Sequence, residues 1–170
     1  ALIAARNSHE SVTKQDFLDA VDRIIGGLEK KNKAIKPSEK KRIAFHEAGH
    51  ATVSWLTEHA APLLKVTIVP RGRSLGAAWY LPEERQITTT EQMLDEMCSL
   101  LGGRAAEQVA LGNYSTGAQN DLERAYKQAN AMVTIYGLSD KIGHVSYYDS
   151  SGQNEYAFSK PYSEKTAEII

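Results

Sequence analysis

Two histidines four residues apart constrain this chain more than any other feature. They bracket the segment 46–50, which reads HEAGH. Pro37 favours a helix start, and the predicted helix runs from there to about Glu58. Residues four apart lie on one face of a helix, so the imidazoles of His46 and His50 can bind the same metal ion. The segment therefore predicts a metal site on a helix.

The glutamate between the histidines indicates catalysis. Zinc is the expected metal, because it takes nitrogen and oxygen ligands in tetrahedral geometry and leaves one position for water. Glu47 would lie beside that water and accept its proton as the water attacks a carbonyl. Apolar flanking residues would keep the site partly dry: Ile43, Ala44, Phe45, Ala48 and Ala51. Two surface histidines that fit a short pattern by chance are the alternative interpretation.

A third protein ligand is needed, and the spacing does not identify it. The metzincin pattern would place glycine at Val53 and histidine at Leu56, so it is excluded. Four candidates remain: His59, His144, Glu107 and Asp121. An isolated histidine is more often an ordinary surface residue. Glu107 lies on the next long predicted helix, as in gluzincin enzymes, and Asp121 starts a helix after a Ser-Thr-Gly turn, so spacing leaves these two open.

The remaining pattern predicts a mostly helical fold with a small β-hairpin. Thr13 and Asp16 resemble a capping box at the start of an N-terminal helix, and a boundary is expected at 27–33. Thr90 is predicted to cap a helix that runs to Leu111. Further along we expect strands at 64–69 and 75–81 with a turn at 70–73, a helix after residues 113–117 that ends at Gly137, a weak strand at 145–148, a polar loop at 149–160 and a helix from Ser163.

The second predicted strand suggests how a substrate is held. Small residues, Gly76, Ala77 and Ala78, precede Trp79 and would let another backbone approach closely. A substrate could add to an exposed edge there as a further β-strand, a mode of binding that accepts many sequences. An ordinary hairpin strand packed on the metal helix explains the pattern equally well.

Composition limits the other classes of function. Lys and Arg total 20 against 21 for Asp and Glu, so we expect no nucleic-acid partner. No apolar run is long enough to span a bilayer. The single cysteine, Cys98, lies in an apolar stretch and is expected to be a buried, inert thiol.

Six segments spread along nearly the whole chain belong to one pattern: ALIAAR at 1–6, DRIIGGLE at 22–29, FHEAGHA at 45–51, KVTIVPRG at 65–72, LGGRAAE at 101–107 and STGAQNDL at 115–122. Together these segments resemble the FtsH family of ATP-dependent, membrane-anchored AAA zinc metalloproteases. The resemblance implies that residues 1–28 are the C-terminal tail of the AAA lid. Residues 29–170 would be a zinc peptidase domain that continues past Ile170.

The resemblance also implies roles for the open candidates and for the whole protein. Asp121 would be the third ligand of one zinc ion per subunit, and Glu107 would lie behind a ligand histidine and hold it. This chain contains no P-loop motif, so ATP would be used only in an ATPase domain outside it. The full protein would be a homo-hexamer, anchored by amino-terminal membrane helices, that degrades unfolded and membrane proteins. We expect the bacterial inner membrane, with this domain on the cytoplasmic side, rather than the mitochondrial inner membrane.

Two rival functions belong to different classes. A partner-binding module that keeps zinc only for stability is disfavoured by the intact Glu47, because purely structural sites are more often closed by cysteines. A zinc hydrolase acting on small molecules is disfavoured by the lid-like residues 1–28. Degradation of casein, with mass spectrometry of the products, would separate both from a peptidase.

Overall fold

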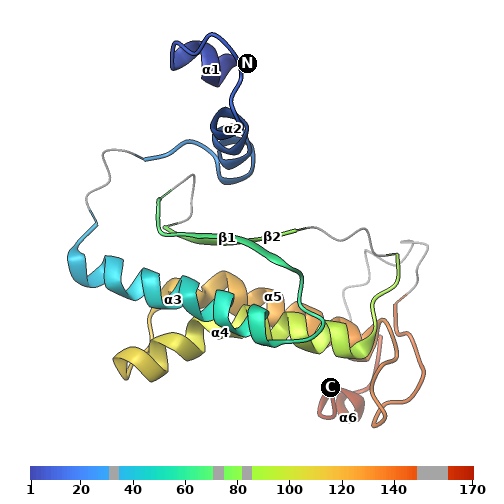
Figure 1. The fold of residues 1–170 in the computed structure, drawn as a ribbon. Coiled ribbons are helices and arrows are strands. Elements are labelled where there is room, and N and C mark those ends of the chain that lie inside the picture. The colour runs from blue at the N-terminus through green and yellow to red at the C-terminus, as the bar shows by residue number, and fades with distance from the viewer. Residues whose placement is uncertain (31–34, 71–74, 82–85, 149–160) are drawn as a thin grey trace.

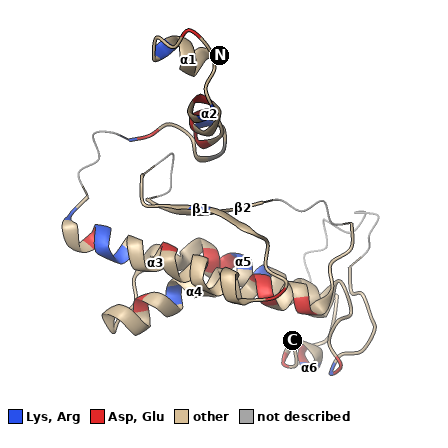
Figure 2. Ribbon diagram, in the orientation of Figure 1, with Lys and Arg blue, Asp and Glu red and all other residues tan. Residues whose placement is uncertain are grey.

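The computed structural model describes residues 1–30, 35–70, 75–81, 86–148 and 161–170 (Figure 1). These residues are mostly helical, with a small antiparallel sheet, as the sequence predicts. In chain order the elements are α1 (Leu2–Arg6), α2 (Lys14–Gly26), α3 (Pro37–Leu56), β1 (Leu63–Thr67), β2 (Ala77–Tyr80), α4 (Thr90–Leu111), the 3₁₀ helix η1 (Thr116–Ala118), α5 (Gln119–Thr134) and α6 (Glu164–Ala167). Among them, no helix combines the length and apolarity needed to cross a membrane. Acidic and basic residues are interspersed over the helices (Figure 2).

Helices α3 and α4 form the centre of the fold, and two glycines let their backbones meet. A Cβ at Gly49 would lie 2.3 Å from the carbonyl oxygen of Gly102, and a Cβ at Gly102 would lie 2.7 Å from that of Gly49. Only glycine fits at such a crossing, because any side chain would force the helices apart. The close approach brings the HEAGH segment of α3 directly against α4.

The hairpin lies over α3 (Figure 1). Strand β1 pairs antiparallel with β2, with Val66 opposite Ala78 and Thr67 opposite Ala77, and the register is irregular between Leu63 and Lys65. Both predicted strands are confirmed but are shorter than expected. Most of the predicted turn and the residues that follow Leu81 lie outside the described residues. The hairpin thus positions β2 beside the metal-site helix.

Helix α2 begins at a capping box, as predicted. The Thr13 hydroxyl accepts from the backbone N–H of Asp16 at 3.2 Å, and the Asp16 carboxylate accepts from the backbone N–H of Thr13 at 2.9 Å. Asp in the place of the usual Glu therefore still satisfies both donors. An ion pair of 2.7 Å between Asp22 and Lys65 links α2 to β1.

Three local predictions are wrong. Thr89, not Thr90, caps α4, because its hydroxyl accepts from the backbone N–H of Gln92. Helix α5 ends at Thr134, before Gly137, because the chain turns back there: the backbone N–H groups of Tyr136 and Leu138 donate to Ala131 and Met132. Residues 145–148 form no strand; the N–H of Tyr147 donates to Thr134 instead of to a neighbouring strand. The predicted loop at 149–160 lies outside the described residues.

Cys98 is exposed rather than buried. The buried residues of α4 are Met93, Gly102, Gly103 and Glu107, and Cys98 is not among them. Apolar neighbours in the sequence therefore did not indicate burial, because successive residues of a helix point about 100° apart and need not share a face.

Candidate metal centre

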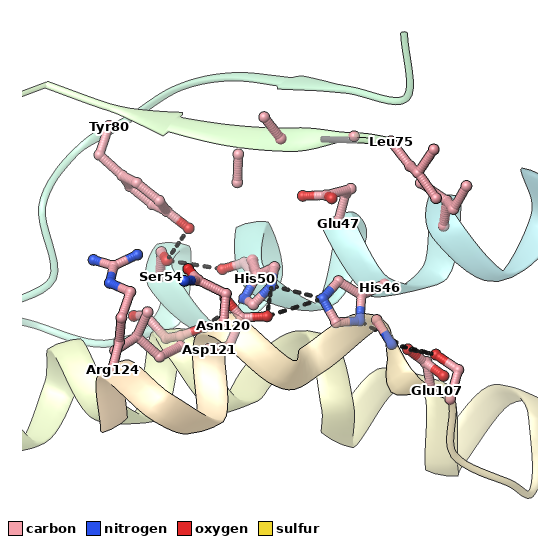
Figure 3. Close-up of a pocket in the computed structure, with 18 of the residues that line it drawn as sticks. His46, Glu47, His50, Ser54, Leu75, Tyr80, Glu107, Asn120, Asp121 and Arg124 are labelled. Carbon is pink, nitrogen blue, oxygen red and sulfur yellow. Dashed lines mark hydrogen bonds and ion pairs between the residues drawn. The ribbon is translucent and has the colours of Figure 1, made fainter. Parts of the chain in front are cut away.

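Three side chains from two helices converge on one point (Figure 3). His46 and His50 face inward from α3, and Asp121 reaches them from the first turn of α5. The two Nε2 atoms are 3.1 Å apart, and Oδ2 of Asp121 lies 3.3 Å from Nε2 of His46 and 3.6 Å from Nε2 of His50. In the described part of the chain this is the one group of three or more His, Cys, Asp or Glu residues with ligand atoms this close.

The spacing of these atoms fits zinc. Tetrahedral bonds of about 2.0–2.2 Å separate neighbouring ligand atoms by about 3.3–3.6 Å. The three observed separations, 3.1, 3.3 and 3.6 Å, lie at or close to that range. Two imidazoles and one carboxylate also form a donor set that leaves one tetrahedral position for water, as in catalytic zinc sites.

The other nitrogen of each histidine fixes the ring. Nδ1 of His50 donates to the backbone carbonyl of Ser99 at 2.8 Å, and Nδ1 of His46 donates to the Glu107 carboxylate at 2.9 Å. A carbonyl oxygen and a carboxylate only accept, so each Nδ1 carries the proton and each Nε2 keeps its lone pair. Two lone pairs and a carboxylate facing one another repel unless a cation lies between them, which favours a metal ion at this point.

Glu107 lies behind His46 and not among the converging atoms. Its side chain is 1% exposed, and it accepts hydrogen bonds from Arg42, Ser115 and His46. Burial alone would raise the pKa of Glu107, but these donors together hold it below its ordinary value. Spacing left two residues open as the third ligand. Asp121 lies beside the Nε2 atoms of both histidines, whereas Glu107 contacts Nδ1 of His46. His59 and His144 do not belong to the group.

A cleft of about 950 Å³ opens over this group. Glu47 lines it, next to the converging atoms. Burial holds the pKa of Glu47 above its ordinary value, although the two histidines lower it in part. The carboxylate packs under the hairpin: a Cβ at Gly76 would lie 2.8 Å from Oε1 of Glu47. Glycine at this position therefore leaves room for the carboxylate beside the cleft.

The predicted substrate strand lies only partly in the cleft. Gly76, Ala77 and Ala78 line it, as expected for a strand that meets a substrate. Trp79 is absent from the described lining residues, and its ring lies 5.6 Å from the ammonium of Lys65 on β1.

Sequence reasoning missed several residues of the site. Ser54, one helical turn beyond His50, lines the cleft, and its hydroxyl is hydrogen-bonded at 3.0 Å to that of Tyr80 in the predicted strand (Figure 3). Arg42 and Ser115 were missed as well, although each holds Glu107. The spacing of Arg42, four residues before His46, was the one available signal, because it places both on one helix face.

Replacing Gly103 with alanine is expected to remove most zinc affinity while the fold is kept. A Cβ at Gly103 would lie 2.6 Å from Nε2 of both His46 and His50. The rings can rotate away more easily than the helices can separate, so the ligand atoms lose their geometry. Zinc content after dialysis, together with the circular dichroism spectrum, measures both effects. Full zinc occupancy in this variant would contradict the geometry of the site.

Comparison with known proteins agrees with this geometry. The sequence model of peptidase family M41 matches residues 33–170. The whole chain aligns with 25% of the length of an ATP-dependent zinc metalloprotease FtsH from Parabacteroides distasonis, at 66% sequence identity. It aligns with 27% of the length of an ATP-dependent zinc metalloprotease FtsH from Karelsulcia muelleri, at 59% identity. It also aligns with 21% of the length of a component of the mouse mitochondrial inner membrane m-AAA protease, at 52% identity. The chain thus spans about a quarter of the length of these relatives.

Proposed function

Because this chain belongs to peptidase family M41, we propose that it is the zinc peptidase domain of an ATP-dependent, membrane-anchored protease. One observation carries the proposal: His46, His50 and Asp121 converge beside an open cleft that Glu47 also lines. This arrangement combines a ligand set for zinc with a carboxylate that is not part of that set.

Each residue has a separate role in peptide hydrolysis. His46, His50 and Asp121 would hold zinc, and the bound metal would supply Lewis acidity for peptide hydrolysis. Glu47 accepts the proton of the attacking water and passes it to the leaving amine. Glu107 keeps the His46 ring oriented through Nδ1, at 2.9 Å.

The names of the relatives support a proposal about the whole protein. Two of them are called ATP-dependent zinc metalloproteases and one a component of a mitochondrial inner membrane protease. We place residues 1–28 in the tail of an ATPase lid and residues 29–170 in the peptidase domain. The complete protein would use ATP in a separate domain, assemble as a homo-hexamer and degrade unfolded and membrane proteins. Higher identity to the two bacterial relatives favours the bacterial inner membrane, with this domain on the cytoplasmic side.

We propose that the edge of β2 that faces away from β1 holds the substrate by strand addition. Among the described residues β2 pairs with β1 alone, and Gly76, Ala77 and Ala78 line the cleft over Glu47. A crystal structure with a peptide inhibitor is expected to show main-chain hydrogen bonds between the inhibitor and this edge. An inhibitor bound elsewhere in the cleft would exclude strand addition.

Degradation of casein by the full-length protein, supplied with ATP and zinc, tests the proposed function. We expect cleavage at many internal peptide bonds, identified by mass spectrometry, that stops on chelation and resumes when zinc is restored. A metal-loaded, folded protein that leaves casein intact would contradict a peptidase. Such a result would favour a zinc module without activity or a hydrolase of small molecules.

A further inference from the structure

Arg42 lies one helical turn before His46, on the same face of α3. Its guanidinium donates to Oε2 of Glu107 at 2.8 Å. It also donates to the backbone carbonyl of Asn113 at 3.3 Å and to the Asn113 side chain at 2.6 Å. The Arg42 side chain is 28% exposed, whereas the carboxylate that it pairs with is 1% exposed. Arg42 therefore supplies the positive charge for a carboxylate that solvent does not reach.

Glu107 connects two elements that carry metal ligands. Its other oxygen, Oε1, accepts from Nδ1 of His46 and from the hydroxyl of Ser115, both at 2.9 Å. Ser115 in turn caps η1, since its hydroxyl accepts from the N–H of Gly117. Helix α5 follows η1 directly and carries Asp121 in its first turn. One buried carboxylate thus lies between the ring of His46 and the segment that places Asp121.

We propose that Arg42 is a positioning residue for the metal ligands and acts through Glu107. An arginine pairs with a carboxylate through a planar, permanently charged group, so it fixes the rotation of the carboxylate as well as its charge. With Oε2 held by Arg42, Oε1 remains directed at His46 and Ser115. Without Arg42 the buried carboxylate has lost its cation, and it can turn or admit water, which loosens both ligands. The inference rests on the proposed zinc site.

Replacing Arg42 with glutamine in the full-length protein is expected to weaken zinc binding about 10- to 100-fold, the range for loss of a group that orients a ligand. Competition with a chromophoric chelator measures the zinc dissociation constant. Thermal unfolding of the metal-free protein, measured alongside, reports any general loss of stability. Arg42→Lys retains the charge but not the planar fork, so it should restore part of the affinity; it also serves as the test if the glutamine variant does not fold.

Arg104 provides a matched control. It also supports the loop after α4, donating to the carbonyl of Ser115 at 3.2 Å and lying 4.2 Å from the centre of the Tyr114 ring. Its described contacts do not include Glu107. Arg104→Gln should therefore change zinc affinity less than about 3-fold. Asn113→Ala removes the other side-chain partner of Arg42 and should have a similarly small effect.

A double-mutant cycle decides whether Arg42 acts through Glu107. In a Glu107→Gln background, Arg42→Gln should weaken zinc binding by less than about 3-fold, because the carboxylate that it positions is gone. Three results would overturn the proposal: unchanged affinity in Arg42→Gln, an equal loss in Arg104→Gln, or the full loss in the Glu107→Gln background. Failure of the zinc site itself would appear differently, as a His46→Ala variant that binds zinc like the wild type.

Discussion

Replacing Glu47 with glutamine is expected to lower casein cleavage by about 10²- to 10⁴-fold, the usual contribution of a general base. Zinc should remain bound, because the carboxylate of Glu47 is not among the converging ligand atoms. Glutamine has the same shape as glutamate, so packing under Gly76 is preserved, but its amide cannot accept the proton of the water. Initial cleavage rates at equal zinc content measure the effect.

Glu39→Gln is the matched control for that experiment. Glu39 lies on the same helix and lines the same cleft, two turns before Glu47, and does not belong to the metal group. Its substitution should leave the cleavage rate within about 3-fold of wild type. A zinc-loaded Glu47→Gln variant that cleaved casein at the wild-type rate would exclude Glu47 as the base.

Replacing Asp121 with alanine is expected to remove most bound zinc and, with it, activity. Asp121 supplies the oxygen that lies 3.3 Å and 3.6 Å from the two imidazole nitrogens, and its loss leaves two protein ligands. Glu107→Gln should retain much more zinc, since Glu107 contacts the far side of His46, and should weaken affinity about 10- to 100-fold. Zinc affinity by chelator competition should therefore fall further in Asp121→Ala than in Glu107→Gln.

A neighbouring carboxylate on α5 serves as the control for Asp121. Glu123 is exposed and pairs with Lys127 one turn further on, away from the metal group. Glu123→Ala should bind zinc like the wild type. The reverse order of effects, with zinc lost in Glu107→Gln and kept in Asp121→Ala, would assign a gluzincin-like ligand set instead.

The parts of the site that depend on local periodicity could be predicted from the sequence. His46 and His50 are neighbours because a helix returns to the same face after four residues. Glu47 follows from its place in the same segment. The capping box at Thr13 and the helix end before Gly112 were likewise set by a few adjacent residues.

The parts that depend on packing between distant segments could not be predicted from spacing. Glu107 and Asp121 are 61 and 75 residues away from His46, and which of them reaches Nε2 depends on how α4 packs against α3 and how α5 packs against α4. The first of these contacts is close because Gly49 meets Gly102, which no periodicity indicates. Only the resemblance to a family indicated that Asp121 rather than Glu107 is the third ligand. Arg42 and Ser115 were missed for the same reason.

One measurement tests the zinc site most directly: an anomalous-scattering map at the zinc absorption edge, from crystals of the zinc-loaded protein. We expect a single peak per chain, within about 2.0–2.2 Å of Nε2 of His46, Nε2 of His50 and a carboxylate oxygen of Asp121. The Glu47 carboxylate should lie beside the peak without being a protein ligand. A peak bonded to Glu107 with Asp121 remote, or no peak between the two histidines, would contradict the site.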